Sequence, residues 1–398
     1  MISMDTINMQ TPYFLLDEED FVKNTTSFQN ALKKYFKKSI IGFSVKTNSF
    51  PYLLKIAREQ GCYAEVVSYT EYELALLCGF PKNRIIYNGP MKSKGTFIDA
   101  LENGAIVNIE TKREIEWLNS LNASKHYNIG IRLNVDITLI SPEDAKHDKD
   151  DSRFGFSAEN EEFEQALKKI KSISNVTLNG LHIHRTSRTR SINFYRNLVK
   201  YSIDIISKYQ LSLNYIDIGG GYFGIFDNKP TYNDYCATIS EVFESQQSKD
   251  LLRKTTIIVE PGNALTASVF DYHTSVIDCK KVGNKVFITT DGTRNDIDPL
   301  FQKQDYIKEI IHKEKNNGNI TKQIVSGCTC LEFDRLFELT NSPQLNIGDK
   351  ICYKNVGAYT MCLSPLFIRY IPKVYSKTTK ELLREEWGAT EYVAQCKM

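Results

Sequence analysis

Four sets of residues in this sequence carry groups suited to chemistry, and each directly follows a short apolar run. Lys46 follows the run 40–45, and His184, Glu260 and the glycines 219–221 follow later runs. A lysine amine can bond covalently to a carbonyl compound, and an imidazole and a carboxylate can hold or move protons. A glycine-rich turn offers backbone N–H groups to a phosphate. The chemistry therefore depends on whether the fold brings these four sets together.

Eight apolar runs of strand length recur between residues 40 and 260, with helical patterns between them. The first five start about 22 residues apart, which is typical of a strand–helix repeat in a parallel sheet. Eight repeats favour an α/β fold of the (β/α)8 TIM-like barrel type over an open doubly wound sheet. The predicted strands are Ile40–Val45, Cys62–Val67, Arg84–Tyr87, Ala105–Ile109, Asn128–Leu133, Thr177–Ile183, Asn214–Ile218 and Thr256–Val259.

The remaining sequence predicts a second domain and an insertion. After about residue 265 the chain is rich in β-type runs, such as KVFITTD and LFIRYIPKVY, with few long helical stretches. We expect a segment 1–36 that contributes a strand to this β domain, a barrel over 37–265 and a C-terminal, mostly-β domain over 266–398. The stretch SPEDAKHDKDDSR (141–153) is charged and free of bulky apolar residues, which predicts a mobile insertion.

Active sites of (β/α)8 barrels lie at the C-terminal ends of the strands. The residues at the ends of the predicted strands include an amine, an imidazole, two carboxylates and a guanidinium, a concentration of polar groups that a barrel without a site would lack. They are Lys46, Ser68, Asn88, Glu110, Arg132, His184, Gly219, Gly220, Gly221 and Glu260.

The glycine turn could bind the phosphate groups of two kinds of ligand. DIGGGYFG (217–224) contains the GxGxxG pattern of dinucleotide-binding folds, which requires a helix to begin at once. Here GIFDNKPTYNDY (224–235) follows, with Pro230 and several turn formers, so a cradle for a single phosphate fits better; a plain tight turn stays open. A phosphate cradle, a strand-end lysine and a facing histidine fit pyridoxal 5'-phosphate, held as a Schiff base of Lys46 with Glu260 at its ring nitrogen.

Each of these residues taken alone also has a plain structural explanation. Lys46 fits a surface lysine, and His184 fits a hydrogen-bonded core histidine, which is what we expect of His182. Glu260 fits a cap of the turn at Pro261 and Gly262. The ordered combination of all of them favours the cofactor site.

At this point the motifs resemble a known family, the pyridoxal-phosphate-dependent decarboxylases of the alanine-racemase-like fold, which includes diaminopimelate, ornithine and arginine decarboxylases. The resemblance runs from TPYFLLDE (11–18) to GAYT (357–360) and beyond, nearly the whole chain. The motifs follow the family's order: FSVKTN, AEVVSYTE with Glu65 where aspartate is common, YNGPMKS, VNIET, SRFGF, GLHIHRTS, DIGGGYFG, VEPG, CTCLEFD and GDKICYKNVGAYT.

The resemblance implies a role for each matching residue. Lys46 would bind the cofactor covalently, His184 would stack on its ring and Glu260 would pair with the ring nitrogen. Cys330, from the partner subunit of a homodimer with shared active sites, would protonate the carbon that loses carbon dioxide. An anionic group at the ring nitrogen favours decarboxylation over racemisation, for which the fold usually uses arginine. The remaining cofactor-binding residues would be Arg132, Ser187, Gly219, Gly220, Gly221, Gly262 and Tyr359.

This sequence departs from the family at the residues that would recognise the substrate. Asn263 stands where arginine usually follows EPG, Asp298 where diaminopimelate enzymes have arginine before proline, and Leu331 where an acidic residue follows the cysteine. Loss of a buried charge partner costs a ligand several kcal/mol. We therefore expect a small-molecule amino acid other than diaminopimelate or ornithine. Arg294, like Arg185, Arg188 and Arg190, is an extra cation that fits a carboxylated or conjugated amino acid of specialised metabolism such as siderophore synthesis, or else a solvated loop charge.

Three alternatives stay open. One is diaminopimelate decarboxylation in lysine biosynthesis. Another is a non-catalytic regulatory homologue that binds a protein partner, although such proteins tend to lose the lysine, the phosphate contacts or the cysteine. The third is a cofactor-homeostasis barrel, which lacks a second β domain.

Composition excludes several other classes. The 398 residues carry a formal net charge of +2, which argues against a dedicated nucleic-acid binder. No apolar run approaches the roughly 20 residues that span a bilayer, and the first residues lack the pattern of a signal peptide. Nine scattered cysteines form no disulfide framework and no metal-ligand spacing. We expect a cytoplasmic protein with no metal, nucleic-acid or membrane partner.

Overall fold

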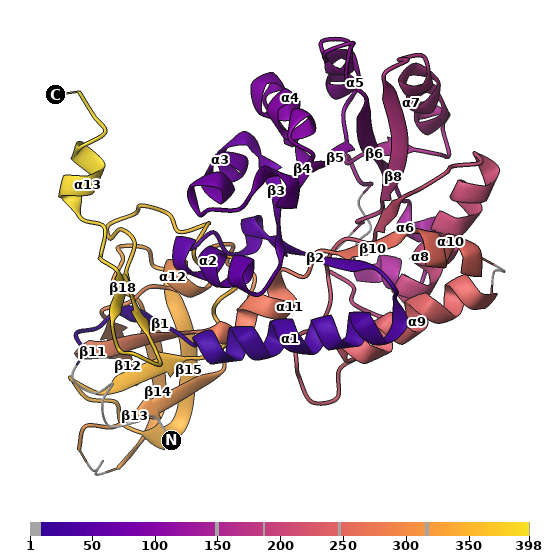
Figure 1. Ribbon diagram of the computed structural model, residues 1–398. Helices are drawn as coiled ribbons and strands as arrows, with labels where there is room; N and C mark the ends of the chain where they lie inside the picture. Colours follow the sequence, from indigo (N-terminus) through magenta and orange to yellow (C-terminus); the bar gives the residue numbers. More distant parts are fainter. Residues whose placement is uncertain (1–8, 148–150, 186–187, 246–247, 315–317, 398) are drawn as a thin grey trace. The chain divides into compact units, whose positions relative to one another are not determined.

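The computed structural model describes residues 9–147, 151–185, 188–245, 248–314 and 318–397. The chain forms two compact units, a barrel unit over Val22–Leu265 and a β unit made of Met1–Phe21 and Thr266–Met398 (Figure 1).

The barrel unit is a closed ring of eight parallel strands, as the sequence predicts. Each strand overlaps one of the eight predicted runs, and the ring closes where Ile257 of the last strand pairs with Ser39 of the first. A short strand, β7 (Phe156–Ser157), pairs with β6 outside the ring. The eight are β2 (Ser39–Ser44), β3 (Tyr63–Ser68), β4 (Ile85–Met91), β5 (Ile106–Ile109), β6 (Tyr127–Asn134), β8 (Val176–His182), β9 (Tyr215–Asp217) and β10 (Thr256–Val259).

Helices connect these strands, and several begin at a residue whose side chain caps the helix. The hydroxyls of Ser68, Ser93, Thr111 and Ser191 each accept a backbone N–H from the first helical turn, which satisfies a donor that would otherwise lack a partner. The helices are α2 (Pro51–Glu59), α3 (Tyr69–Leu77), α4 (Lys94–Glu102), α5 (Lys112–Leu118), α6 (Ile137–Ile140), α7 (Glu162–Lys171), α8 (Ile192–Lys208), α9 (Tyr232–Ser245), α10 (Lys249–Lys254) and α11 (Asn263–Thr266).

Helix α1 (Glu18–Tyr35) accounts for a difference between the compact units and the predicted boundary at residue 36. The units divide after Phe21, so most of α1 lies in the barrel unit. There, Phe28 stacks on Tyr232 at 4.4 Å between ring centroids, and the Gln29 side chain donates to the carbonyl of Gln60 at 2.7 Å.

Tyr215, the first residue of β9, fills part of the barrel interior. A Cβ added at Gly130 would lie 2.1 Å from the Tyr215 hydroxyl, and one at Gly180 would lie 1.9 Å from its ring. Glycine at both positions therefore makes room for a buried phenol inside the ring of strands.

The β unit is built around one long strand, β11 (Phe270–Val282), and includes the N-terminal strand β1 (Tyr13–Leu16). β1 pairs antiparallel with β11 and parallel with β17, so the run TPYFLL does join the β sheet. The other elements are β12 (Lys285–Thr290), β13 (Lys308–Ile311), β14 (Asn319–Ser326), β15 (Arg335–Pro343), β16 (Lys350–Tyr353), β17 (Lys373–Ser376), β18 (Leu382–Arg384), α12 (Arg294–Ile297) and α13 (Ala389–Val393).

The predicted insertion 141–153 is anchored along part of its length, contrary to the expectation of a wholly mobile segment. Residues 144–147 form a 3-10 turn, and the Asp144 carboxylate accepts hydrogen bonds from Ser141, Thr189 and Ser191 at 2.6–2.9 Å. A charged stretch can thus be anchored by hydrogen bonds to residues outside it, here Thr189 and Ser191. None of the described helices is both long and apolar enough to cross a membrane.

Candidate active site

The C-terminal ends of the barrel strands surround a cavity of about 330 Å³, a size typical of small-molecule sites. Five of the residues predicted at the strand ends line it, namely Lys46, Asn88, Arg132, His184 and Glu260. Glu65, His182 and Phe154 complete much of the wall.

Lys46 lies in the 3-10 turn Val45–Thr47 that ends β2, and its amine is bound by Glu65 of β3. The Nζ–Oε2 distance is 2.5 Å, and the Lys46 side chain is 37% exposed whereas Glu65 is 1% exposed. Burial acts to lower the pKa of Lys46, but the carboxylates of Glu65 and Glu260 outweigh it and raise that pKa above its usual value. Glu65 therefore keeps the amine charged and holds it at the cavity.

Glu260 follows β10 and lies beside two other buried polar side chains, His182 and Asp217. Burial acts to raise the pKa of Glu260, but His182 and Lys46 lower it below its usual value. Burial and the Glu260 carboxylate raise the pKa of Asp217 well above its usual value. Of the two neighbouring carboxyl groups, Glu260 is thus the anion and Asp217 the protonated acid.

His182 corrects one prediction. It is buried, but neither ring nitrogen hydrogen-bonds to any of the described residues, and its Nε2 lies 3.6 Å from Glu260 Oε2. It is therefore part of the site wall and is not a hydrogen-bonded core histidine.

His184 is a neutral imidazole. Burial, followed by the charges of Arg132 and Lys46, lowers the pKa of His184 to about 3. Its Nδ1 accepts the backbone N–H of Gly220 at 3.3 Å. An uncharged ring fixed by that hydrogen bond is suited to stack on a flat ligand.

Close packing or backbone conformation favours glycine throughout this turn. Gly219 has φ +73°, and a Cβ there would lie 2.5 Å from the His184 Cβ. A Cβ at Gly220 would lie 2.3 Å from the Glu260 carbonyl oxygen, and Gly221 has φ +97°. A Cβ at Gly262 would lie 2.1 Å from a Thr47 side-chain oxygen. Side chains are excluded from this turn, which leaves backbone groups next to His184 and Glu260.

Arg132 is less available than predicted. Its guanidinium donates to Glu110 at 2.8 Å and to the His184 carbonyl at 3.0 Å, and it lies 4.7 Å from the Phe154 ring. It fixes the strand end that carries His184. Ser187, also predicted, lies outside the described residues.

Sequence reasoning missed a partly buried carboxyl group that follows the Ser68 strand end. Glu71 lies in the first turn of α3, where its N–H donates to the Ser68 hydroxyl and its carboxylate accepts from the Val67 N–H at 2.8 Å. Burial raises the pKa of Glu71 to about 7. The capping pattern Ser68-x-x-Glu71 was a visible signal for it.

All but one of the remaining predicted residues belong to the β unit. Cys330 is exposed and Leu331 and Tyr359 are half-buried, Tyr359 with a φ of +66°. Arg294 donates to Asp298 Oδ2 from Nε at 3.1 Å and from NH2 at 2.8 Å. Asp298 also accepts from Gln302 N, Lys303 N and Tyr306 Oη. The two predicted substrate residues thus bind one another, and Asn263 begins α11 in the barrel unit.

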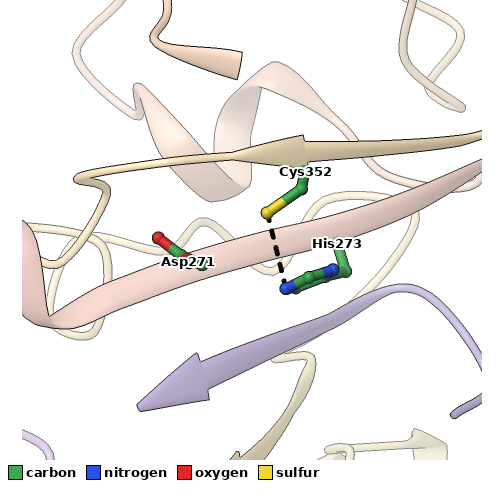
Figure 2. A group of neighbouring side chains, drawn as sticks. All are labelled: Asp271, His273 and Cys352. Carbon is green, nitrogen blue, oxygen red and sulfur yellow. Dashed lines mark hydrogen bonds between the residues drawn. The ribbon is translucent and has the colours of Figure 1, made fainter. Parts of the chain in front are cut away.

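One cluster in the β unit has metal-ligand chemistry. Asp271 and His273 lie on β11 and Cys352 on the neighbouring β16, and their ligand atoms are within 4.8 Å of one another (Figure 2). The Cys352 sulfur lies 3.5 Å from His273 Nε2. The Lys354 amine lies 2.7 Å from Asp271 Oδ2, so this group of donors already has a cation.

The barrel cavity fits pyridoxal phosphate by its own chemistry. An amine, an anionic carboxylate and a neutral imidazole line it. The glycine turn packs directly behind that imidazole, where the Gly220 N–H donates to His184. The unpartnered nitrogens of His182 and the unpartnered Asp217 Oδ2 are buried polar atoms next to that carboxylate, among the described residues.

Comparison with known proteins agrees with a pyridoxal phosphate site. Residues 19–267 match the model of the pyridoxal-dependent decarboxylases, pyridoxal binding domain. The chain is 31% identical over 372 residues to a probable chloroplastic diaminopimelate decarboxylase of Oryza sativa subsp. japonica, covering 90% of this chain and 73% of the relative. It is 25% identical to the L-glutamyl-[BtrI acyl-carrier protein] decarboxylase of Niallia circulans, covering 98% and 94%. The solved diaminopimelate decarboxylase of M. jannaschii superposes with a TM-score of 0.84 at 22% identity, covering 98% and 93%.

A closed barrel with a strand-end lysine and a separate β unit defines the class of protein. The chain belongs to the family of pyridoxal-dependent decarboxylases, and its activity is the decarboxylation of an amino acid with pyridoxal phosphate.

Proposed function

We propose that the substrate is an α-amino acid whose distal group is neither the free amine of ornithine nor the amino acid end of diaminopimelate. The observation that carries this is the closed pair of Arg294 and Asp298. A salt bridge made through two guanidinium nitrogens, with Asp298 only 3% exposed, leaves that carboxylate little capacity for a substrate amine. Leu331, next to Cys330, offers no charge at all.

A polar cavity beside the catalytic one supports a carboxylated or conjugated substrate. It measures about 400 Å³ and is lined by Lys112, Arg153 and Arg185 among others, and Arg153 borders both cavities. Acidic residues also line it, and Lys112 is paired with Glu162 at 2.9 Å. Arg153 is therefore the cation best placed to meet an anionic extension of a substrate in the main cavity. The Niallia relative acts on a glutamyl group carried by a protein, which is a conjugate of this kind.

The residues of this chain divide the work. Bound pyridoxal phosphate supplies an electron sink for the pair left when carbon dioxide departs. Lys46 would hold the cofactor through its amine, and Glu260 would hold a proton at the ring nitrogen. His184 would support the face of the ring. The glycine turn at 219–221, with Gly262, would bind the phosphate, a role in which the family resemblance also includes Ser187 and Tyr359.

We further propose a homodimer in which Cys330 acts on the partner subunit's site. Cys330 is exposed in the β unit, which makes its thiol available to a second chain. The thiol would deliver the proton to the carbon that lost carbon dioxide.

A screen of carbon dioxide release tests the substrate proposal. Ornithine, meso-diaminopimelate, glutamate and a phosphopantetheine thioester of glutamate would be offered to the wild type and to Arg153→Ala. We expect turnover of an acidic or conjugated substrate, with a KM raised about tenfold or more in Arg153→Ala. Diaminopimelate turnover equal to or above all others would refute the proposal and support the alternative of lysine biosynthesis, which the rice relative favours.

A further inference from the structure

A single chain of hydrogen bonds runs through the barrel interior to both carboxylates of the site. The Tyr215 hydroxyl donates to Asn108 Oδ1 at 2.7 Å, and Asn108 Nδ2 donates to Asn88 Oδ1 at 2.8 Å. Asn88 Nδ2 then donates to Glu260 Oε1 at 2.6 Å and to Glu65 Oε1 at 3.1 Å. Tyr215, Asn108 and Asn88 are 8%, 0% and 1% exposed, so water does not compete for these groups.

Each residue in this series of hydrogen bonds donates toward the site, and that order of donors and acceptors fixes the orientation of the Asn88 side chain. A carboxamide has one oxygen acceptor and one nitrogen with two N–H donors. The Asn88 oxygen is used by Asn108, whose own oxygen is used by Tyr215. Flipping the Asn88 amide would turn its oxygen toward two carboxylates, which repel it. Both of its N–H groups must therefore point at the site, one to each carboxylate.

The two carboxylates differ in what they serve. Glu65 Oε2 binds the Lys46 amine at 2.5 Å and the Ser44 hydroxyl at 2.6 Å, so Asn88 supports it from its other oxygen. Glu260 likewise gives Oε1 to Asn88 and keeps Oε2 on the side of His182. Glu65 and Glu260 are 1% and 4% exposed, so neighbouring polar groups are the main stabilisers of their charges.

We propose that Asn88 is a positioning residue that holds Glu65 and Glu260 in place as anions, so that the amine end and the ring-nitrogen end of the cofactor site are set by one side chain. The proposal rests on the proposed role of Glu260. Hydrogen bonds from neutral donors to ionised acceptors are the strong ones in a low-dielectric interior. An apolar residue of similar size would fill the same space and supply neither of them.

The test compares Asn88→Leu and Asn88→Asp with the wild-type holoprotein. The first readout is the dissociation constant of pyridoxal phosphate, and the second is the pH at which the absorbance of the bound cofactor changes. For Asn88→Leu we expect cofactor binding about tenfold weaker, the loss expected of charge-assisted hydrogen bonds. For Asn88→Asp the added negative charge next to Lys46 should move the absorbance transition up by about one pH unit.

Controls separate this role from a structural one. Asn128→Asp adds the same charge at an exposed barrel position on β6 and should leave both readouts unchanged. Asn88→Thr, which keeps one donor, serves if Asn88→Leu does not fold, and it should bind the cofactor with intermediate affinity. Folded Asn88 variants that bind the cofactor within twofold of wild type and titrate within about 0.3 pH unit of it would overturn the proposal. If the wild-type protein shows no absorbance from bound cofactor, the proposed cofactor roles of Lys46 and Glu260 are refuted instead.

Discussion

Replacing Glu71 with glutamine should make the protein more stable at neutral and alkaline pH. Burial raises the pKa of Glu71 from 4.5 to about 7, so the folded state binds a proton that the unfolded state releases between these values. Stability from the neutral form is therefore present at low pH and is lost as pH rises through about 7. The two pKa values differ by about 2.5, and each unit is worth ~1.4 kcal/mol, so the full effect is about 3 kcal/mol.

Glutamine is a suitable replacement because it is neutral at every pH and its oxygen can still accept the Val67 N–H, which Glu71 binds at 2.8 Å. Urea unfolding of the wild type and Glu71→Gln would be followed at pH 5 and at pH 8, with the same cofactor concentration throughout. With a pKa of about 7 in the folded state, we expect an advantage for Glu71→Gln of about 1 kcal/mol at pH 5, just above the ordinary pKa, and of about 3 kcal/mol at pH 8.

Glu73→Gln is the matched control, since Glu73 is exposed on the same helix α3 and should show no such dependence. A stability difference between Glu71→Gln and the wild type that stays constant from pH 5 to pH 8 would refute the reasoning, because it would mean that Glu71 ionises alike in both states.

Three further results follow from the site. Borohydride reduction followed by peptide mass spectrometry should place the cofactor on Lys46, and label on any other side chain would contradict the assignment. Gly219→Ala should weaken cofactor binding tenfold or more, because its Cβ would lie 2.5 Å from His184. Gly95→Ala, whose Cβ would have no atom within 4 Å, should leave cofactor binding unchanged, and equal effects of the two substitutions would count against the packing argument. Mixed Lys46→Ala and Cys330→Ala proteins should recover up to a quarter of the wild-type activity in exchanged dimers, and no recovery despite exchange would exclude a shared site.

The strand ends of the barrel could be predicted from the sequence because two periodic signals agree there. Apolar runs recur at the spacing of a strand–helix unit, and a polar residue follows each run. Lys46, His184 and Glu260 were found in this way without any contact being known, and all three line one cavity.

The hydrogen bonds that hold the site carboxylates in place could not be predicted, since they join side chains on different strands. That Asn88 reaches both Glu65 and Glu260 follows from register and side-chain length, which no local pattern records. The closed pair of Arg294 and Asp298 was missed for a related reason. Each residue was considered for what it offers a substrate, although spacing of i and i+4 on a helix already favours their pairing.

The closure of the barrel between β2 and β10 has a consequence for how the protein is made. Lys46 emerges from the ribosome early, but its ring of strands is incomplete until Thr256–Val259 has been synthesised, and Glu260 comes directly after. β1 pairs with β11, which begins at Phe270, and its second partner, β17, begins only at Lys373. A chain with such distant pairings folds slowly, so the barrel of the nascent protein keeps an unpaired strand edge through most of its translation. Ribosome-bound chains shorter than about 260 residues should therefore be unable to retain the cofactor.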